Sequence, residues 1–413
     1  MAEVLFYVMV GVLVFDFLFE RWLDVLNLKH FKPELPRELE GVYDRETYAK
    51  SQQYLKANSR LSLYRAVFSF LLIMGMLLFH GFACLDEWVR QWSTHDGVRT
   101  LLFFGVLGLG TDLLTLPFQL YGTFVVEEKF GFNKTTLRTF FSDKLKSWLV
   151  GGIIGGGILL FLYWVYAGNA TLFPVFALAG IGFFMVFMAM FYTSLIVPLF
   201  NNLTPLADGQ LRAAIEKLAA QTGFKLTDVF VMDGSKRSTK ANAYFSGLGP
   251  KKKIILYDTL IEKLSSREVV AVLAHEIGHY RKKHIYKGLA LSLLQLFIMV
   301  FLMGKALALP VFSQALGAGQ MSFYMGLLAF ALLYSPVSFL TDILTNRFSR
   351  KHEYEADAYA VSLGLGKALL QALVKLSVTS LSNLQPHPLY VFFHYSHPTL
   401  LQRKQAIEKR MGQ

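Results

Sequence analysis

The chain has few cysteines and few charged residues, and each scarcity excludes a class of protein. Its 413 residues include a single cysteine, Cys84, so an intramolecular disulfide framework is excluded. Charged residues make up 17% of the chain, fewer than the roughly 25% found in soluble globular domains. Hydrophobic residues instead make up 54%. This composition is not that of an ordinary soluble enzyme and is typical of a protein embedded in a lipid bilayer.

Seven apolar runs have lengths close to the about 20 residues that a helix needs to cross a bilayer. They lie at Val4–Trp22, Leu61–Cys84, Thr100–Phe124, Trp148–Ala167, Leu172–Phe200, Gly288–Phe312 and Met321–Leu344. The first run follows Met1-Ala2-Glu3, which lacks the basic start of a signal peptide, and no small-residue cleavage site comes after it. We therefore expect seven transmembrane helices, the first of them retained as an anchor.

Acidic residues are outnumbered by basic ones, 29 to 41, which gives a formal net charge of +12. The excess is concentrated in the loops after the first and third runs, and loops rich in lysine and arginine remain in the cytoplasm. An odd number of spans then places the N-terminus outside and the C-terminus in the cytoplasm. Because the basic residues lie in loops that flank the membrane and do not cluster on a soluble domain, we expect the lipid bilayer as a partner and expect no nucleic-acid partner.

The segment between the fifth and sixth runs has the pattern of a small cytoplasmic domain. It predicts a helix at Gln210–Thr222 and strands at Val229–Met232, Ala241–Phe245 and Ile254–Asp258, the last after a Gly249-Pro250 turn. Ser265 and Glu268 have the spacing of a capping box that starts the next helix. The chain is thus predicted to contain five spans in residues 1–200, this insertion in 201–287, two spans in 288–346 and a cytoplasmic C-terminal segment in 347–413 that completes the active site.

The pentapeptide His275-Glu276-Ile277-Gly278-His279 lies in that helix and has the HExxH spacing of zinc-dependent hydrolases. Residues four apart lie on one helical face, so His275 and His279 can bind one metal ion. Glu276 can then reach a water molecule at the same ion and act as a general base. Catalytic zinc usually has three protein ligands, so one more ligand has to come from elsewhere in the chain.

Candidates for the third ligand follow the seventh run, at His352, Glu353 and Glu355. Glu353 and Asp357 are one helical turn apart, so Glu353 can face the metal while Asp357 accepts a hydrogen bond from a ligating histidine. This pairing favours Glu353 and leaves His352 and Glu355 as alternatives. A solvated acidic face is the simpler interpretation of the same residues.

Six separated segments resemble one family in the right order. They are Glu127–Lys134, Gly234–Ser238, Asn242–Phe245, the HExxH helix, Arg350–Asp357 and Ser396–Pro398. In these segments the chain resembles the type I CAAX prenyl endopeptidases, which are integral-membrane zinc metalloproteases that act on prenylated CAAX proteins. The resemblance implies an all-α polytopic membrane fold in which seven transmembrane helices surround a large chamber, with a cytoplasmic α+β zinc metalloprotease domain.

The same resemblance implies a metal centre and a catalytic base. It makes His275, His279 and Glu353 the ligands of one Zn²⁺ per chain and Glu276 the catalytic base, in agreement with the spacing argument. Asp357 remains the predicted partner of a ligating histidine. The sequence therefore predicts a zinc metalloendopeptidase.

Substrate contacts are implied by two further segments. His397 and Arg403 lie in the segment that resembles the part of the family that stabilises the tetrahedral intermediate. Without the resemblance, His397 beside Pro398 is more simply a helix-capping or surface residue. The resemblance also implies an edge strand at Asn242, Ala243 and Tyr244 that pairs with an extended substrate peptide.

Two basic residues upstream of that strand have two interpretations. Lys236 and Arg237 could attract a substrate carboxylate, although exposed basic residues are more often simply solvated.

The sequence leaves the substrate and the membrane open. The resemblance implies a peptide or protein substrate that carries a prenyl group. Short loops after the second, fourth and sixth spans, and the absence of a retention signal at Lys409–Gln413, favour a bacterial inner membrane over the endoplasmic reticulum of a eukaryote. In that setting the alternative is a quality-control protease without a prenyl requirement. We expect a monomer.

A non-enzymatic alternative is a transporter with structural zinc. Glu276 argues against it, because a structural zinc site needs no neighbouring acid. Four charged residues fall within or beside the predicted spans, where they either line the chamber or pair helices with one another. They are Asp16, Asp112, Lys305 and Asp342.

Overall fold

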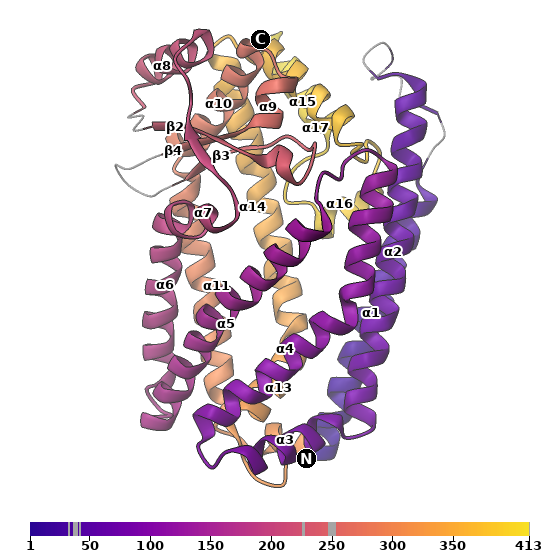
Figure 1. The fold of residues 1–413 in the computed structure, drawn as a ribbon, viewed down its shortest axis with the longest axis vertical. Coiled ribbons are helices and arrows are strands. Elements are labelled where there is room, and N and C mark those ends of the chain that lie inside the picture. Colours follow the sequence, from indigo (N-terminus) through magenta and orange to yellow (C-terminus); the bar gives the residue numbers. More distant parts are fainter. Residues whose placement is uncertain (32–33, 36–39, 41–42, 225–227, 247–252, 413) are drawn as a thin grey trace.

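The computed structural model describes the whole chain except residues 32–33, 36–39, 41–42, 225–227, 247–252 and 413. The predicted Gly249-Pro250 turn lies outside the described residues. Long helices run along the molecule, and a small sheet with short helices covers one end of them (Figure 1). This is the mostly helical, polytopic fold with an added α+β domain that the sequence predicts.

Six helical segments are long and apolar enough to cross a membrane. They are α1 (Ala2–Lys29), α2 (Arg45–Leu78), α4 (Asp96–Tyr121) continued by the π-helical η2 (Gly122–Glu127), α5 (Leu137–Gly168), α6 (Phe173–Leu195) continued by α7 (Val197–Phe200), and α11 (His284–Leu307). A seventh consists of α13 (Phe323–Leu333) and α14 (Ser335–Ser362), which meet at an angle of 52°. The bend falls just before Pro336, which cannot donate a backbone hydrogen bond. The predicted seven spans are therefore found when this bent pair counts as one.

Two predicted spans end at the wrong residue. The second run was expected to continue to Cys84, but α2 ends at Leu78, and His80, with a φ of 54°, turns the chain into α3 (Gly81–Trp92). The sixth run was expected to begin at Gly288 and reach Phe312, but α11 begins at His284 and ends at Leu307, and Pro310 starts the short helix α12 (Pro310–Ala315). Hydropathy stays high through these turns, so it does not reveal where the backbone changes direction.

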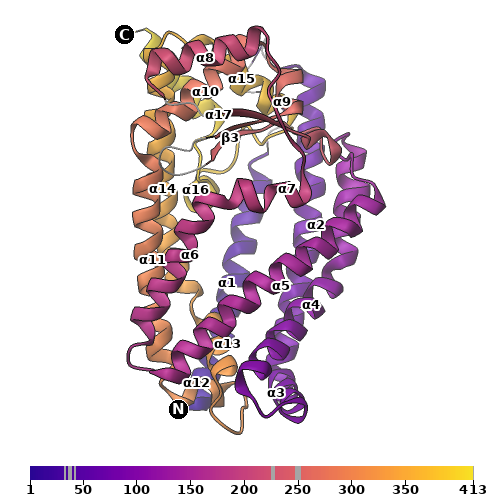
Figure 2. The ribbon, with the colours of Figure 1, turned by 60° about the vertical axis from the view of Figure 1, so that its left-hand side comes forward.

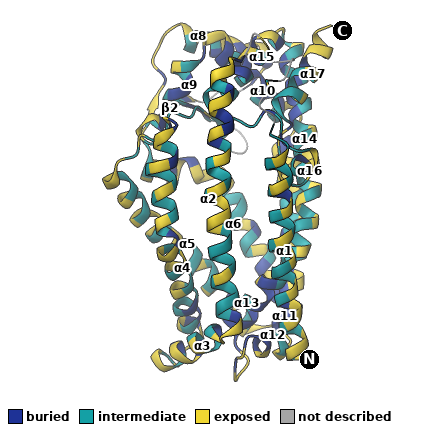
Figure 3. Ribbon diagram, turned by 90° about the vertical axis from the view of Figure 1, so that its right-hand side faces the viewer, coloured by how far each residue is buried: buried dark blue, intermediate teal, exposed yellow. Residues whose placement is uncertain are grey.

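The spans bury only a small part of their apolar surface within the protein. Helices α4 and α5 are inclined across the molecule, while α1, α2, α6 and α11 run more nearly along it (Figures 1 and 2). Only 6% of the most apolar window of α1 and of α2 is buried within the protein, against 22% for α11. Buried residues gather instead at the two ends of the molecule (Figure 3). Such sparse burial fits helices arranged around a chamber better than a closely packed bundle, and the chamber itself remains a prediction.

The two termini lie at opposite ends of the molecule (Figure 1). Backbone hydrogen bonds join the segment after η2 to the sheet domain, from Lys134 N to Arg237 O at 3.0 Å and from Thr239 N to Phe132 O at 3.1 Å. The loop after the third span thus lies on the same side as the insertion and the C-terminal segment. This is the arrangement that the loop charges predict, and the compartment that each side faces remains a prediction.

Four strands form the sheet, in the order β1-β2-β4-β3. They are β1 (Leu203–Pro205), β2 (Asp228–Met232), β3 (Ala243–Ser246) and β4 (Lys253–Tyr257), with β2 and β4 parallel and the other pairs antiparallel. The three predicted strands are all present, each shifted by two residues or fewer. The short β1 was not predicted, and Asp258 does not end a strand but begins helix α9 (Asp258–Lys263). The strand β3 lies at the edge of the sheet.

Helices cover the sheet and form the core of the domain. They are α8 (Gln210–Thr222), with the predicted bounds, α10 (Ser266–Arg281), α15 (Gly366–Thr379) and α17 (Leu400–Met411). A further helix, α16 (Pro388–His394), packs against α14 and α1. Ile254, Leu256 and Ile277 are buried between the sheet and α10. The predicted capping box is present, because the Ser265 side chain accepts from Glu268 N while the Glu268 carboxylate accepts from Ser265 N at 2.7 Å. It fixes where the HExxH helix begins.

The four predicted intramembrane charges have different surroundings. Lys144 Nζ donates to Asp112 at 2.7 Å, and Trp148 Nε1 donates to the same carboxylate at 2.8 Å, so Asp112 pairs α4 with α5. Lys305 lies near the end of α11 with its ammonium 5.6 Å from the centre of the Phe301 ring. The side-chain carboxylates of Asp16 and Asp342 form no hydrogen bond or ion pair with the described residues.

Candidate metal centre

The helices α10 and α14 cross very closely at Gly278. A Cβ atom on this glycine would lie 3.0 Å from the Cα of Ala356 and 3.0 Å from the Cβ of Tyr359. Any larger residue would push the helices apart. Their close approach brings Glu353 and Asp357 on α14 opposite the two histidines of α10.

His275, His279 and Glu353 converge on one point. The Nε2 atoms of the two histidines are 3.2 Å apart, and the Glu353 carboxylate is 3.5 Å from His275 Nε2 and 3.2 Å from His279 Nε2. One ligand atom from each of the three residues lies within 4.8 Å of the other two. Of the three predicted candidates for the third ligand, the structure thus places Glu353 in this group.

These three side chains fit a bound zinc ion. His275 Nδ1 lies 2.8 Å from the Asp357 carboxylate, which can only accept, so the ring proton belongs on Nδ1 and the lone pair on Nε2. This lone pair, the Nε2 atom of His279 and the Glu353 carboxylate beside them form a set of donors that could bind one metal ion. Two nitrogens on one tetrahedral zinc ion at about 2.0–2.1 Å would be roughly 3.3 Å apart, close to the separation found here.

Asp357 and Arg403 hold the side chains of this group in place through hydrogen bonds and ion pairs. Arg403 donates to both oxygens of Asp357, at 2.9 Å and 2.6 Å, and its NH1 lies 3.3 Å from the Glu353 carboxylate. The side chain of Asp357 is 2% exposed and that of Arg403 is 11% exposed. One guanidinium therefore holds the carboxylates of both Glu353 and Asp357 in place. Most of the Arg403 donors face these acids, and its predicted role in stabilising the tetrahedral intermediate stays a prediction.

Burial and charge act on the ionisable groups of the site in opposite directions. Burial by itself would lower the pKa of His275, but hydrogen bonds to Asp357 and Glu353 raise it to about 9. The surroundings therefore favour positive charge at this point, as a divalent cation would supply. Burial raises the pKa of Glu276 above its ordinary value, and the neighbouring His275 and His279 oppose the rise. Glu276 is thus a stronger base than a carboxylate in water.

Glu276 is available to a water molecule. It is next to His275 on the helix and partly exposed. None of the described residues donates a hydrogen bond to its carboxylate. This is the position that the HExxH spacing predicts for a general base.

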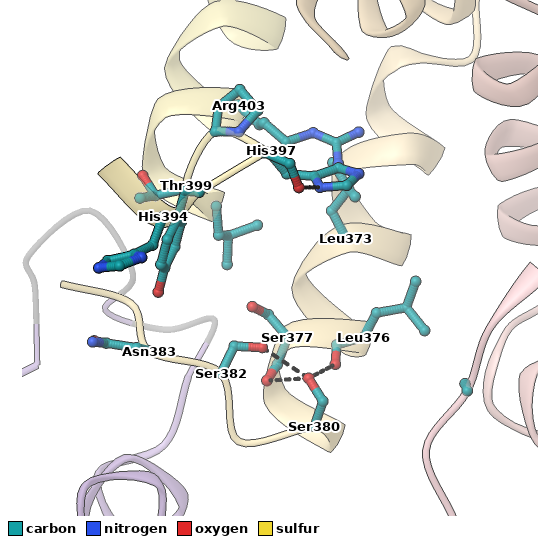
Figure 4. A pocket seen from close by; sticks show the side chains of 15 residues that line it. Leu373, Leu376, Ser377, Ser380, Ser382, Asn383, His394, His397, Thr399 and Arg403 are labelled. Atoms are coloured by element: carbon teal, nitrogen blue, oxygen red, sulfur yellow. Dashed lines mark hydrogen bonds between the residues drawn. The ribbon is translucent and has the colours of Figure 1, made fainter. Parts of the chain in front are cut away.

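A pocket of about 490 Å³ opens beside the metal-binding group, with His397 and Arg403 in its lining (Figure 4). His397 Nε2 lies 3.4 Å from the Glu353 carboxylate, and its Nδ1 is 2.9 Å from the Ser396 hydroxyl. The His397 side chain is 63% exposed, so its ring is open to a molecule in the pocket. Ala241, just before β3, lines the same pocket.

The edge strand that the resemblance implies is present, and its pairing with a substrate peptide remains a prediction. Ala243 and Tyr244 belong to β3, which pairs with β4 on one side and has no further strand on the other among the described residues. Asn242 precedes it and is exposed, with its side-chain oxygen accepting from Ala243 N at 2.9 Å. An extended peptide could therefore add to the sheet at this edge.

Two contacts of the loop before β3 were not predicted. Lys240 Nζ donates to Glu127 and to the Tyr54 hydroxyl, each at 2.8 Å, so the loop is bonded to η2 and α2. Arg237 donates to both oxygens of Asp143 on α5, at 2.7 Å and 2.9 Å. Arg237 is therefore neither simply solvated nor free for a substrate carboxylate, whereas Lys236 is exposed. These partners are far apart in the sequence, so no local sequence pattern predicts the contacts.

The fold and the site together define a membrane-embedded metalloprotease, and comparisons with known proteins agree. Residues 24–202 match the family described as CAAX prenyl protease N-terminal, five membrane helices, and residues 205–411 match peptidase family M48. The chain belongs to this family of integral-membrane metallopeptidases.

Individual relatives match over nearly their full length. The chain is 33% identical to CAAX prenyl protease 1 of Saccharomyces cerevisiae, with 96% of this chain and 94% of the relative aligned. It is 35% identical to the CAAX prenyl protease 1 homolog of Arabidopsis thaliana, over 97% of this chain and 96% of the relative. The crystal structure of S. mikatae Ste24p superposes with a TM-score of 0.94 and 33% identity, covering 98% of this chain and 99% of the other.

Proposed function

We propose that this metalloprotease binds one Zn²⁺ through His275, His279 and Glu353 and cleaves prenylated CAAX proteins near their C-terminus. The convergence of these three side chains on one point is the observation that carries the metal site. The substrate class is supported by the names of relatives that match the chain from end to end. Asp357 orients His275 in this proposal.

Each residue of the site has a task in peptide hydrolysis. A bound zinc ion would polarise the scissile carbonyl and acidify a water molecule beside it. Glu276 takes a proton from that water as the C–O bond forms, and it delivers this proton to the leaving amine as the C–N bond breaks in the following step. His397, open to the pocket, donates to the carbonyl oxygen as negative charge develops there. Arg403 acts mainly through Glu353 and Asp357, and its direct contact with the oxyanion remains a prediction.

The substrate peptide meets the site along β3. Asn242, Ala243 and Tyr244 pair with the main chain of the peptide, which makes recognition largely independent of its side chains. A prenyl group would then lie among the apolar spans. If the prenyl group is dispensable, a broader role in removing misfolded membrane proteins is the alternative.

The remaining features of the proposal concern the setting of the enzyme. The four-part division at residues 200, 287 and 346, the cytoplasmic C-terminus, the monomeric state and the choice between a bacterial inner membrane and the endoplasmic reticulum remain predictions. None of them alters the chemistry proposed for the site.

Metal removal tests the proposed function directly. Dialysis of the purified protein against a chelator should abolish cleavage of a farnesylated CAAX peptide, because the carbonyl and the water lose their activating ion, and one equivalent of Zn²⁺ should restore it. Cleavage is followed by mass spectrometry of the peptide products. The same peptide without the farnesyl group should be cleaved at least about 10-fold more slowly, since burying a chain of apolar carbons contributes about 0.8 kcal/mol per CH₂.

Two results would contradict this prediction. Chelator-resistant cleavage would exclude the metal mechanism. Equal rates for the two peptides would exclude the prenyl requirement and favour the broader proteolytic role.

The substitution His397→Ala should lower kcat about 10²–10³-fold with little change in KM, because the lost hydrogen bond is made mainly in the transition state. Zinc content, measured by atomic absorption, should stay at the wild-type value, because the ring is not one of the proposed ligands. His394→Ala is a suitable control, since His394 also lines the pocket but pairs with Glu20 at 3.3 Å. A loss of zinc in His397→Ala would mean that His397 is a ligand.

A further inference from the structure

A second group, made of two imidazoles and a carboxylate, contacts His279 on the Nδ1 side of its ring. His284, at the start of α11, places its Nδ1 3.0 Å from the Nδ1 of His279. Its other ring nitrogen, Nε2, lies 2.9 Å from the carboxylate of Glu355 on α14. The ring of His352 stacks on that of His284, with centroids 3.9 Å apart and an interplanar angle of 12°. A series of hydrogen-bond contacts thus connects His279 through His284 to the carboxylate of Glu355.

The turn between α10 and α11 positions His284. Helix α10 ends at Arg281, and Lys283 adopts a φ of 57°, a left-handed conformation that residues other than glycine seldom adopt. This turn sets the ring of His284 against that of His279, with centroids 5.1 Å apart, and buries His284 until only 5% of it is exposed. An unusual backbone conformation is therefore maintained next to the site, where such conformations often have a positioning role.

Counting protons gives the chain of hydrogen bonds a direction. Glu355 as a carboxylate can only accept, so Nε2 of a neutral His284 carries the proton that it donates. Nδ1 of His284 is then an acceptor and takes the proton of His279 Nδ1. His279 is left with its lone pair on Nε2, the atom that faces His275 and Glu353. The two contacts thus select the tautomer in which His279 can bind a metal ion.

We propose that His284 and Glu355 are positioning residues that hold His279 in its metal-binding orientation and tautomer. The inference rests on the proposed function, in which His279 is a zinc ligand. It gives the two ligating histidines different supports, since His275 is held directly by Asp357 and His279 is held by a carboxylate through an intervening imidazole. Residues hydrogen-bonded to metal ligands commonly change metal affinity 10–100-fold when they are removed.

This arrangement also explains the two residues that the sequence left as alternative ligands. Glu355 faces His284, and His352 stacks on the same ring, so two residues, His284 and His279, separate each of them from the proposed metal position. Among the described residues, only His275, His279 and Glu353 form a group that could hold a metal. The cluster around His284 is therefore a support of that centre and not a second centre.

Zinc affinity of the full-length protein, purified in detergent, tests the proposal without relying on activity. Competition with a chromophoric chelator should show binding about 10–100-fold weaker in His284→Ala than in the wild type. His284→Asn should recover affinity to within about 3-fold, because the amide oxygen can accept from His279 Nδ1 as the ring nitrogen did. The absorption spectrum of the Co²⁺-substituted protein should change in His284→Ala and return toward the wild-type spectrum in His284→Asn.

Three further variants complete the design. Glu355→Ala should weaken zinc binding about 10-fold. The Glu355 side chain is 29% exposed and that of His284 is 4% exposed, so this variant replaces His284→Ala if the latter does not fold. His95→Ala is the control, because His95 is exposed, caps α4 by accepting from Gly97 N and belongs to neither histidine group. The zinc affinity of this variant should equal that of the wild type. His279→Ala should lose zinc altogether.

The outcomes separate the two hypotheses. Wild-type affinity in both His284→Ala and Glu355→Ala, with zinc lost in His279→Ala, would overturn the positioning role and leave the proposed metal centre standing. Equal weakening in His284→Ala and His284→Asn would also overturn it, because the hydrogen bond would then not be what matters. Wild-type affinity in His279→Ala would overturn the metal centre itself.

Discussion

Replacing Glu276 by glutamine is expected to lower kcat about 10³-fold or more while leaving zinc bound. Glutamine has nearly the same shape as glutamate but cannot take a proton, and general-base catalysis commonly contributes 10²–10⁴-fold. Because Glu276 is not one of the three converging ligands, zinc content and thermal stability should change little. Steady-state kinetics with a fluorogenic CAAX peptide, together with metal analysis of the same sample, measures both quantities.

A matched control for this substitution is Glu262→Gln, since Glu262 is an exposed glutamate on the neighbouring helix α9. It should have wild-type kinetics. Full activity in Glu276→Gln would mean that another group takes the proton, and the proposed mechanism would then be wrong.

The second large effect is expected from Asp357→Leu. This substitution removes the acceptor of His275 Nδ1–H and leaves the largely buried Arg403 with one of its two carboxylate partners. Zinc affinity should fall about 10–100-fold, as for other residues that orient a ligand. Breaking a buried ion pair on one side typically destabilises a protein by 3–5 kcal/mol, so the free energy of unfolding should fall by about 3 kcal/mol. Chelator competition and denaturant unfolding of the detergent-solubilised protein measure the two effects.

The double variant Asp357→Leu with Arg403→Met separates those effects. Replacing both members of a buried pair by apolar residues is often close to neutral for stability, so most of the unfolding free energy should return. Zinc affinity should stay low, because His275 still lacks its acceptor. Recovery of zinc binding in the double variant would show that Asp357 acts only by neutralising Arg403.

Local patterns in the sequence predicted the parts of the site that lie within one helix. The HExxH spacing placed His275 and His279 on one face of α10, and Ser265 with Glu268 marked where that helix begins. Both inferences use contacts between residues three or four apart, and the helical repeat alone fixes these.

Contacts between distant segments could not be predicted in this way. Glu353 reaches the histidines of α10 only because Gly278 lets α14 approach, and the sequence shows the glycine without showing the crossing. The preference for Glu353 over Glu355 came from its spacing to Asp357 and from a family resemblance. The contacts of Lys240 and Arg237 with residues of α2, η2 and α5 had no signal in the sequence at all.

The ends of the membrane helices were predicted poorly for a different reason. Hydropathy measures whether a segment is apolar, and the residues around His80 and Pro310 are apolar on both sides of a turn. A helix that stops and restarts in another direction keeps the same mean hydropathy. Only the backbone, through the positive φ of His80 and the missing N–H of Pro310, shows the break.

The contacts of the loop before β3 limit how far this enzyme could be truncated. The acidic partners of this loop, Glu127 and Asp143, lie in the part of the chain that matches the membrane family. The loop itself and β3 lie in the part that matches the peptidase family. Excising the peptidase part as a soluble catalyst would leave Lys240 and Arg237 without counter-ions and the edge strand without its lateral supports. A minimal version of this protease would therefore have to supply substitutes for both acids, because its scaffold for substrate binding is shared across the boundary between its two parts.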